Sequence, residues 1–122
     1  MTTKDPELLK LQPGVRCLLA SYKAAAYGRG HSWDLTPAQA GALFHGDCDY
    51  CGDPPIERII NPRNANPYVI VVNGIDRVDN DLGYTPENSV SCCKLCNQMK
   101  RDLGADTFRN HCAKVSKIAI RN

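Results

Sequence analysis

The stretch of sequence that decides the fold begins with CDYC at residues 48–51 and ends with CKLC at residues 93–96. Two residues between cysteines let both thiolates of a pair reach one tetrahedral ion, and two such pairs complete four ligands. The segment between the pairs is longer than a simple zinc ribbon needs, so we expect the metal to tie together the two ends of a β-hairpin. The sequence therefore predicts one structural zinc ion bound by Cys48, Cys51, Cys93 and Cys96.

The remaining cysteines leave alternatives open. The chain has seven cysteines and no pattern typical of an export signal, which favours reduced thiols over a closed disulfide framework. Cys92 competes with Cys93 as a ligand, whereas Cys17 and Cys112 fall on predicted helix faces and are typical of small core residues. The other interpretation of the two pairs is four buried or redox-active thiols, but the aspartates at positions 47, 49 and 53 argue against a dry apolar site.

Length and composition favour one soluble domain over residues 1–122, and the helices and strands expected along it make it an α+β domain. The chain has 122 residues, 43% of them hydrophobic, and a formal net charge of +2. We expect a helical N-terminal part at 1–46, a zinc-clamped core at 47–103 and a C-terminal helix at 104–122. No run of about 18 apolar residues is present, so neither a membrane span nor a secreted protein is expected, and a cytoplasmic location follows.

The secondary structure can be predicted from proline and glycine positions and from apolar periodicity. Pro13 opens a helix that stops at Gly28, and Thr36 and Pro37 open a second helix that ends near Gly46. After the first cysteine pair we predict strands at 56–60 and 68–75, a loop at 76–88, a strand at 89–92, a helix at 93–103 and a last amphipathic helix at 106–118 that presents Phe108, Val115 and Ile118.

Basic residues are concentrated in two stretches, although the net charge is small. Residues 8–33 carry basic side chains and no acid, and from position 94 onward seven basic residues face only two aspartates. Both stretches are typical of surfaces that bind a polyanion. In the second stretch we expect phosphate contacts from Lys94, Lys100, Arg101 and Arg109.

Residues 73–100, NGIDRVDNDLGYTPENSVSCCKLCNQMK, carry a resemblance to a known family. Together with the first cysteine pair they resemble the HNH, or His-Me finger (ββα-metal), endonucleases over roughly residues 47–103. The resemblance implies a zinc-clamped ββα core in which Asp76 and Asn97 bind a divalent cation and Asn88 braces the loop. Two oxygen ligands with the other positions left to water and phosphate suit Mg²⁺ or Mn²⁺.

One position departs from the family pattern, because Arg77 stands where the general-base histidine normally follows the metal-binding aspartate. An arginine cannot accept a proton at neutral pH. The Asp-Arg pair resembles the branch that contains the PacI-type restriction enzyme and small phage HNH proteins, where a Ser-Tyr helix and a histidine precede the first cysteine pair. Ser21-Tyr22 and His31 match those features.

The base therefore has to come from elsewhere in the chain. Tyr22 is the first candidate for base or nucleophile, with its pKa lowered by Arg77, although it also lies on an apolar helix face that favours core packing. His31 is the second candidate, and His111 becomes one if the last helix folds over the site.

The resemblance predicts a metal-dependent DNA endonuclease of restriction, phage or homing type. The alternatives are a non-catalytic zinc-containing module that binds DNA, which Arg77 favours, and a purely structural zinc protein. Double-stranded DNA is the expected partner. A homodimer on a palindromic site would be the simplest way to cut both strands.

Overall fold

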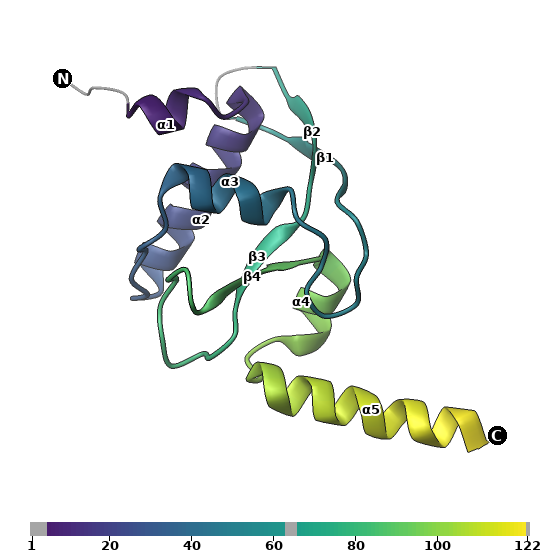
Figure 1. Ribbon diagram of the computed structural model, residues 1–122. Coiled ribbons are helices and arrows are strands. Elements are labelled where there is room, and N and C mark those ends of the chain that lie inside the picture. The colour runs from purple at the N-terminus through teal and green to yellow at the C-terminus, as the bar shows by residue number, and fades with distance from the viewer. Residues whose placement is uncertain (1–4, 63–65, 122) are drawn as a thin grey trace.

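The computed structural model describes residues 5–62 and 66–121 and has the mixed α+β architecture that the sequence predicts, with helices at both ends (Figure 1). In chain order the elements are α1 (Pro6–Leu9), α2 (Pro13–Gly28), α3 (Pro37–Phe44), β1 (Ile56–Ile60), β2 (Tyr68–Val72), β3 (Gly74–Arg77), β4 (Ser89–Cys92), α4 (Lys94–Lys100) and α5 (Ala105–Arg121).

The helices of the N-terminal part begin where local chemistry places them. Pro13 occupies the first turn of α2, where its missing N–H costs nothing. Thr36 caps α3 in a capping box: its side chain accepts a hydrogen bond from the Gln39 backbone N–H, and the Gln39 side chain accepts one from the Thr36 N–H. The boundaries predicted for these two helices are confirmed, whereas α1 was not predicted.

The strands form two separate antiparallel pairs, β1 with β2 and β3 with β4. The prediction of one strand over 68–75 was wrong at Asn73, where the chain leaves the first pair and enters the second. The buried Asn73 amide donates to the carbonyls of Gly46 (2.9 Å) and Asp53 (3.2 Å), and its backbone N–H donates to Phe44 (2.7 Å). These bonds attach the bend to the loops on both sides of the first cysteine pair.

Two other boundaries differ from the prediction. β3 extends through Arg77, so Asp76 and Arg77 lie on a strand and not in the loop that was expected to begin at Asp76. α4 ends at Lys100, three residues earlier than predicted, because Arg101 adopts a positive φ of 52° that ends the helical hydrogen bonding.

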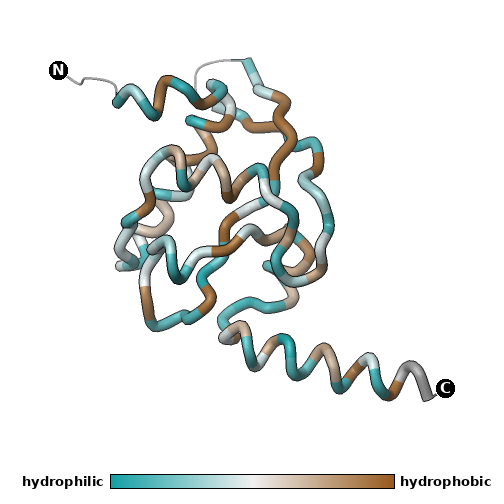
Figure 2. The backbone as a smooth tube through the Cα atoms, in the orientation of Figure 1, coloured by the Kyte–Doolittle hydropathy of each residue, from teal (hydrophilic) through white to brown (hydrophobic). Residues whose placement is uncertain are grey.

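Buried apolar side chains form two clusters. The larger one joins α2 and α3 to the strands and includes Val15, Phe44 and Val72, none of them exposed. Figure 2 shows brown, hydrophobic segments along β2, one of the strands of this cluster. The smaller cluster surrounds the cysteines and includes Phe108 from the start of α5.

α5 extends away from the rest of the chain beyond its first turns (Figure 1). The amphipathic helix is present, but of its three predicted apolar side chains only Phe108 is buried, whereas Val115 and Ile118 are more than half exposed. Within the described ranges, no helix is both long enough and apolar enough to span a bilayer.

Candidate active site and metal centre

The two cysteine pairs lie on tight turns whose backbone is held by local hydrogen bonds. In the first, the Gly52 N–H donates to the Cys48 carbonyl (2.8 Å), and Gly52 has a φ of 83° that a residue with a side chain rarely adopts. In the second, Cys93 caps α4, and its sulfur accepts a hydrogen bond from the Cys96 N–H at 3.3 Å. Each pair therefore turns both sulfurs to the same side.

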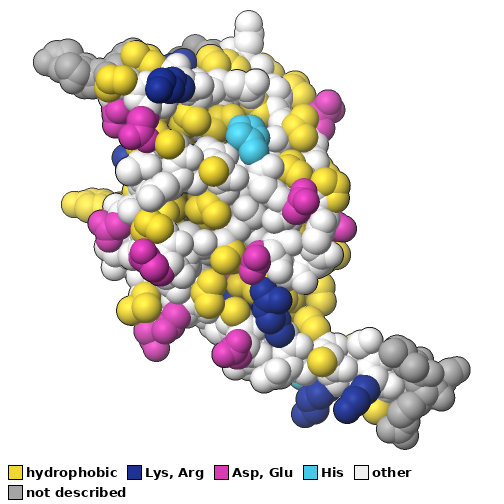
Figure 3. Space-filling view, viewed as in Figure 1, with side chains coloured by type: hydrophobic (Ala, Val, Ile, Leu, Met, Phe, Trp, Pro, Cys, Tyr) yellow, Lys and Arg dark blue, Asp and Glu magenta, His cyan; other side chains and the backbone are white. Residues whose placement is uncertain are grey.

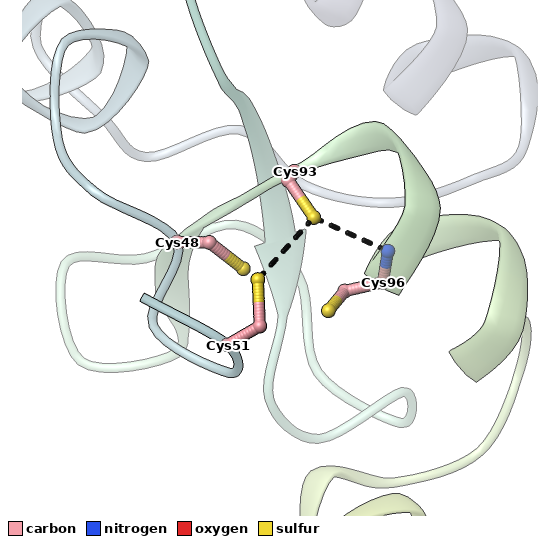
Figure 4. A group of neighbouring side chains, drawn as sticks. All are labelled: Cys48, Cys51, Cys93 and Cys96. Atoms are coloured by element: carbon pink, nitrogen blue, oxygen red, sulfur yellow. Dashed lines mark hydrogen bonds between the residues drawn. The ribbon is translucent and has the colours of Figure 1, made fainter. Parts of the chain in front are cut away.

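The four sulfurs of Cys48, Cys51, Cys93 and Cys96 converge (Figure 4) and lie within 4.8 Å of one another. The sulfurs of Cys51 and Cys93 are 3.7 Å apart, close to the separation of about 3.8 Å that tetrahedral Zn–S bonds of about 2.3 Å require. Burial would raise the pKa of Cys48, but hydrogen bonds from the backbones of Cys93, Cys51 and Tyr50 and from the Cys51 side chain outweigh it and lower the pKa to about 7. The cluster could hold zinc.

Cys92 lies outside this cluster, so Cys93 supplies the sulfur at that end. The Cys92 thiol donates to the Cys93 carbonyl at 3.4 Å, and its pKa is raised, chiefly by burial and also by the Asp76 charge. Cys17 and Cys112 are not part of the four-sulfur group either, as predicted.

A hollow of about 480 Å³ opens between α2, β1, β3 and α4 and collects several of the predicted site residues. Asp76 and Arg77 enter it from β3, Tyr22 from α2, and Asn97 from α4 directly after Cys96. The turn of the second cysteine pair thus determines where Asn97 lies. Three further arginines line the hollow, namely Arg29, Arg58 and Arg101.

The Asp76 carboxylate is largely buried, and one of its oxygens is engaged. Oδ2 accepts a hydrogen bond from the Tyr50 hydroxyl at 2.8 Å and pairs with the Lys100 ammonium at 3.1 Å. Lys100 has no exposed surface and also donates to the Arg77 carbonyl at 3.2 Å. Among the hydrogen bonds of the described residues, none uses Oδ1, so this oxygen and the exposed Asn97 amide suit a divalent cation in the hollow.

The position of Lys100 corrects one sequence prediction. We expected Lys100 to contact phosphate with the other basic residues near α4, but it is a buried partner of Asp76. Arg109 is engaged too, because its guanidinium pairs with Asp49 at 2.9 Å and lies 4.7 Å from the centre of the Tyr50 ring. Lys94 and Arg101 remain exposed and border hollows of the surface.

Arg77 is held by the loop that follows β3. It donates to the carbonyls of Asn80 (2.7 Å) and Leu82 (3.0 Å), and its guanidinium carbon lies 5.7 Å from the centre of the Tyr84 ring. The same loop is tied by the buried Asn88. The Asn88 side-chain oxygen accepts from the Asp79 N–H (2.8 Å), and its nitrogen donates to the carbonyls of Asp79 (3.0 Å) and Gly83 (2.9 Å).

Tyr22 both lines the hollow and packs against the core. Its ring meets Phe44 edge to face with centroids 5.2 Å apart, and its hydroxyl lies so close to Gly74 that a side chain there would collide with it. Burial raises the Tyr22 pKa above 10.0, and a hydrogen bond from the Ile75 backbone and the charge of Arg58 oppose this only in part. The expectation that Arg77 lowers this pKa was wrong.

The described lining of the hollow contains no histidine. His31 is absent from the described lining of the hollow, but slight burial and the nearby charges of Arg77 and Arg29 lower its pKa below 6.5. Its imidazole is therefore mostly neutral at pH 7. His111 is exposed on α5, and α5 contributes no described residue to the hollow, so the condition for a role of His111 as a base is not met.

Sequence reasoning missed Arg58 and Tyr50. Arg58 lies on β1 between Ile56 and Ile60, and a charge between apolar residues on one face of a strand was the signal that could have revealed it. Tyr50 lies within the first cysteine pair and has no local signal for a contact with Asp76. Figure 3 shows acidic side chains spread over the face that it displays. The lining of the hollow, in contrast, contains four arginines.

Comparisons with known proteins give two significant similarities, and no protein-family model matches the chain. Uncharacterized protein R423 of Acanthamoeba polyphaga mimivirus is 32% identical over 95 residues, which cover 78% of this chain and 16% of that protein, so the chain spans only a small part of this relative. Among solved structures, the rare-cutting HNH restriction endonuclease PacI is similar with a TM-score of 0.56 and 26% identity, over 96% of this chain and 89% of that chain.

Proposed function

Because the chain resembles an HNH restriction endonuclease in fold, we propose that it is a metal-dependent DNA endonuclease that hydrolyses phosphodiester bonds. The observation that carries the proposal is the hollow, in which the candidate cation ligands Asp76 and Asn97 stand among four arginines. The four-cysteine cluster, proposed to bind structural zinc, holds the start of α4 and with it Asn97.

The residues of the hollow match the demands of phosphodiester hydrolysis. A Mg²⁺ or Mn²⁺ ion at Asp76 and Asn97 would stabilise negative charge on the phosphate oxygens. Arg58 and Arg101 offer planar, permanently charged donors for the DNA backbone around that point. Arg77 adds positive charge beside Asp76 even though two loop carbonyls hold its guanidinium.

The proton acceptor is proposed to be Tyr22 or His31. Tyr22 lines the hollow, but its raised pKa keeps the phenol protonated at neutral pH. His31 lies outside the described lining, but its lowered pKa keeps the imidazole ready to accept a proton. The location in the hollow therefore favours Tyr22 as the acceptor, whereas the unprotonated state of the imidazole favours His31.

Cleavage of supercoiled plasmid with Mg²⁺, with Mn²⁺ and with a chelator of divalent cations tests the proposal. We expect metal-dependent nicking or linearisation that Asn97→Ala reduces strongly, since Asn97 is exposed and its loss should spare the fold. Gln98→Ala is the matched control, because Gln98 is the next exposed amide of α4 and does not line the hollow with Asp76. No cleavage by the wild-type chain with any divalent cation would refute the nuclease proposal.

A second candidate is a non-catalytic zinc-containing module that binds DNA. Arg77 in place of the family's histidine favours it, and the loop carbonyls that hold Arg77 show a structural use for this residue. An electrophoretic mobility shift that weakens steeply with salt, together with no cleavage, would support this candidate, because release of counterions from phosphates makes binding salt-dependent.

The biological setting is proposed by the same reasoning. Restriction, phage DNA processing and homing are settings in which a DNA endonuclease works inside a cell. A homodimer on a palindromic site would let one active site per chain cut both strands. Light scattering of the protein with and without cleaved DNA would measure whether two chains assemble.

A further inference from the structure

Tyr50 connects the first cysteine pair to the hollow. It stands between Cys48 and Cys51 in the chain, yet its hydroxyl reaches Asp76, 26 positions further on, with an O–O distance of 2.8 Å. Asp76 belongs to β3, and the cysteine turn precedes β1. A residue of the proposed zinc site therefore touches the carboxylate proposed to hold the catalytic cation.

Two residues of α5 contact the Tyr50 ring. Phe108 meets the ring edge to face at 5.5 Å with an interplanar angle of 87°, and the Arg109 guanidinium carbon lies 4.7 Å from the ring centre. Arg109 is in turn paired with Asp49, the neighbour of Tyr50. The first turns of α5 thus determine where the phenol points.

The hydroxyl can only donate in this contact. The phenol O–H is the donor and Asp76 Oδ2 is the acceptor. It shares Oδ2 with Lys100, and no hydrogen bond of the described residues uses Oδ1. The carboxylate, which belongs to the lining of the hollow, therefore has one oxygen held by Tyr50 and Lys100 and one that no hydrogen bond of the described residues uses.

We propose that Tyr50 is a positioning residue, which holds Oδ2 of Asp76 so that Oδ1 faces the divalent cation. This inference rests on the proposed function and adds a role for the cysteine turn beyond stability. Partners that orient a metal ligand from behind commonly change metal affinity by about 10–100-fold when they are removed.

Tyr50→Phe tests this inference, because it keeps the ring between Phe108 and Arg109 and removes only the hydroxyl. The main readout is Mn²⁺ affinity of the zinc-loaded protein, measured by electron paramagnetic resonance of free Mn²⁺. We expect about 10–100-fold weaker Mn²⁺ binding, an unchanged DNA affinity in Ca²⁺, and a cleavage rate that recovers when Mn²⁺ is raised. Tyr27→Phe is the matched control, since Tyr27 is 89% exposed, and should change none of these.

The outcomes separate this inference from the nuclease proposal. If the wild type binds Mn²⁺ and cuts DNA but Tyr50→Phe binds Mn²⁺ equally well, the positioning role is wrong and the nuclease proposal stands. If Tyr50→Phe loses its zinc or its fold, the hydroxyl serves folding and the positioning role is also wrong. If the wild type neither binds Mn²⁺ nor cuts DNA, both proposals fail.

Discussion

Replacing Asp76 with alanine should lower the free energy of unfolding substantially. The loss of a residue needed only for function would leave it unchanged. Lys100 has no exposed surface, and the Asp76 carboxylate, 10% exposed, is its ion-pair partner at 3.1 Å. Asp76→Ala leaves this ammonium buried without a compensating charge. It also removes the acceptor of the Tyr50 hydroxyl.

The magnitude follows from the burial of the pair. Removing one partner of a buried ion pair typically costs about 3–5 kcal/mol, since the other charge stays desolvated. The pair between Asp49 and Arg109 has nearly the same N–O distance, 2.9 Å, but its side chains are 53% and 47% exposed. Asp49→Ala should therefore cost at most about 1 kcal/mol.

Urea denaturation of zinc-saturated protein, followed by far-ultraviolet circular dichroism, measures both variants. We expect Asp76→Ala to lower the free energy of unfolding by about 3–5 kcal/mol and Asp49→Ala to lower it by about 1 kcal/mol or less. Adding Lys100→Met to Asp76→Ala should restore most of the loss without restoring cleavage, because a buried charge is replaced by an apolar side chain of similar length.

Two results would refute this reasoning. Either Asp76→Ala and Asp49→Ala show equal, small losses, or the double variant is no more stable than Asp76→Ala alone. In the first case the fold would tolerate the loss of this carboxylate, and in the second case the cost of Asp76→Ala would not come from a buried, unpaired Lys100.

Three further predictions concern the metal, the loop and the base. Removing zinc with a strong chelator, or Cys48→Ser, should remove on the order of 10 kcal/mol of folding free energy and lower the melting temperature, whereas Cys17→Ser should keep both the zinc and the melting temperature. Asn88→Ala should cost about 3 kcal/mol in urea denaturation, about 1 kcal/mol for each of its three shortest hydrogen bonds, and a loss below about 1 kcal/mol would show that water replaces the amide. The pH dependence of single-turnover cleavage should identify the base: with His31, whose pKa lies below 6.5, the rate falls only as the pH drops below that value, and with Tyr22, whose pKa lies above 10.0, the rate still rises as the pH approaches 10. A flat rate across both ranges would exclude both residues.

Much of the site could be predicted where the deciding interactions are local. Each cysteine pair lies within one turn of backbone, so the spacing of two residues already determines that both sulfurs face the same way. Pro13 and the Thr36 cap mark helix starts through bonds to residues three or four positions away. Asp76 and Asn97 were proposed as cation ligands from the family resemblance, and both line the hollow.

The errors fall where distant segments meet. The strand predicted over 68–75 is β-branched from Val69 to Val72, but the Asn73 amide binds Gly46 and Asp53, and the strand divides there. The pKa of Tyr22 is raised chiefly by burial and is not lowered by Arg77, which sequence reasoning had placed beside it.

The sequence by itself therefore determined the four-sulfur cluster, the starts of α2 and α3 and the return strand β4, because these depend on residue type and short spacing. Only the tertiary structure decided that Lys100 is buried against Asp76, that Tyr50 reaches the same carboxylate, and that Arg58 enters the hollow. The physical reason is that desolvation and pairing of a charge depend on everything packed around it, and those neighbours come from segments that no local pattern connects.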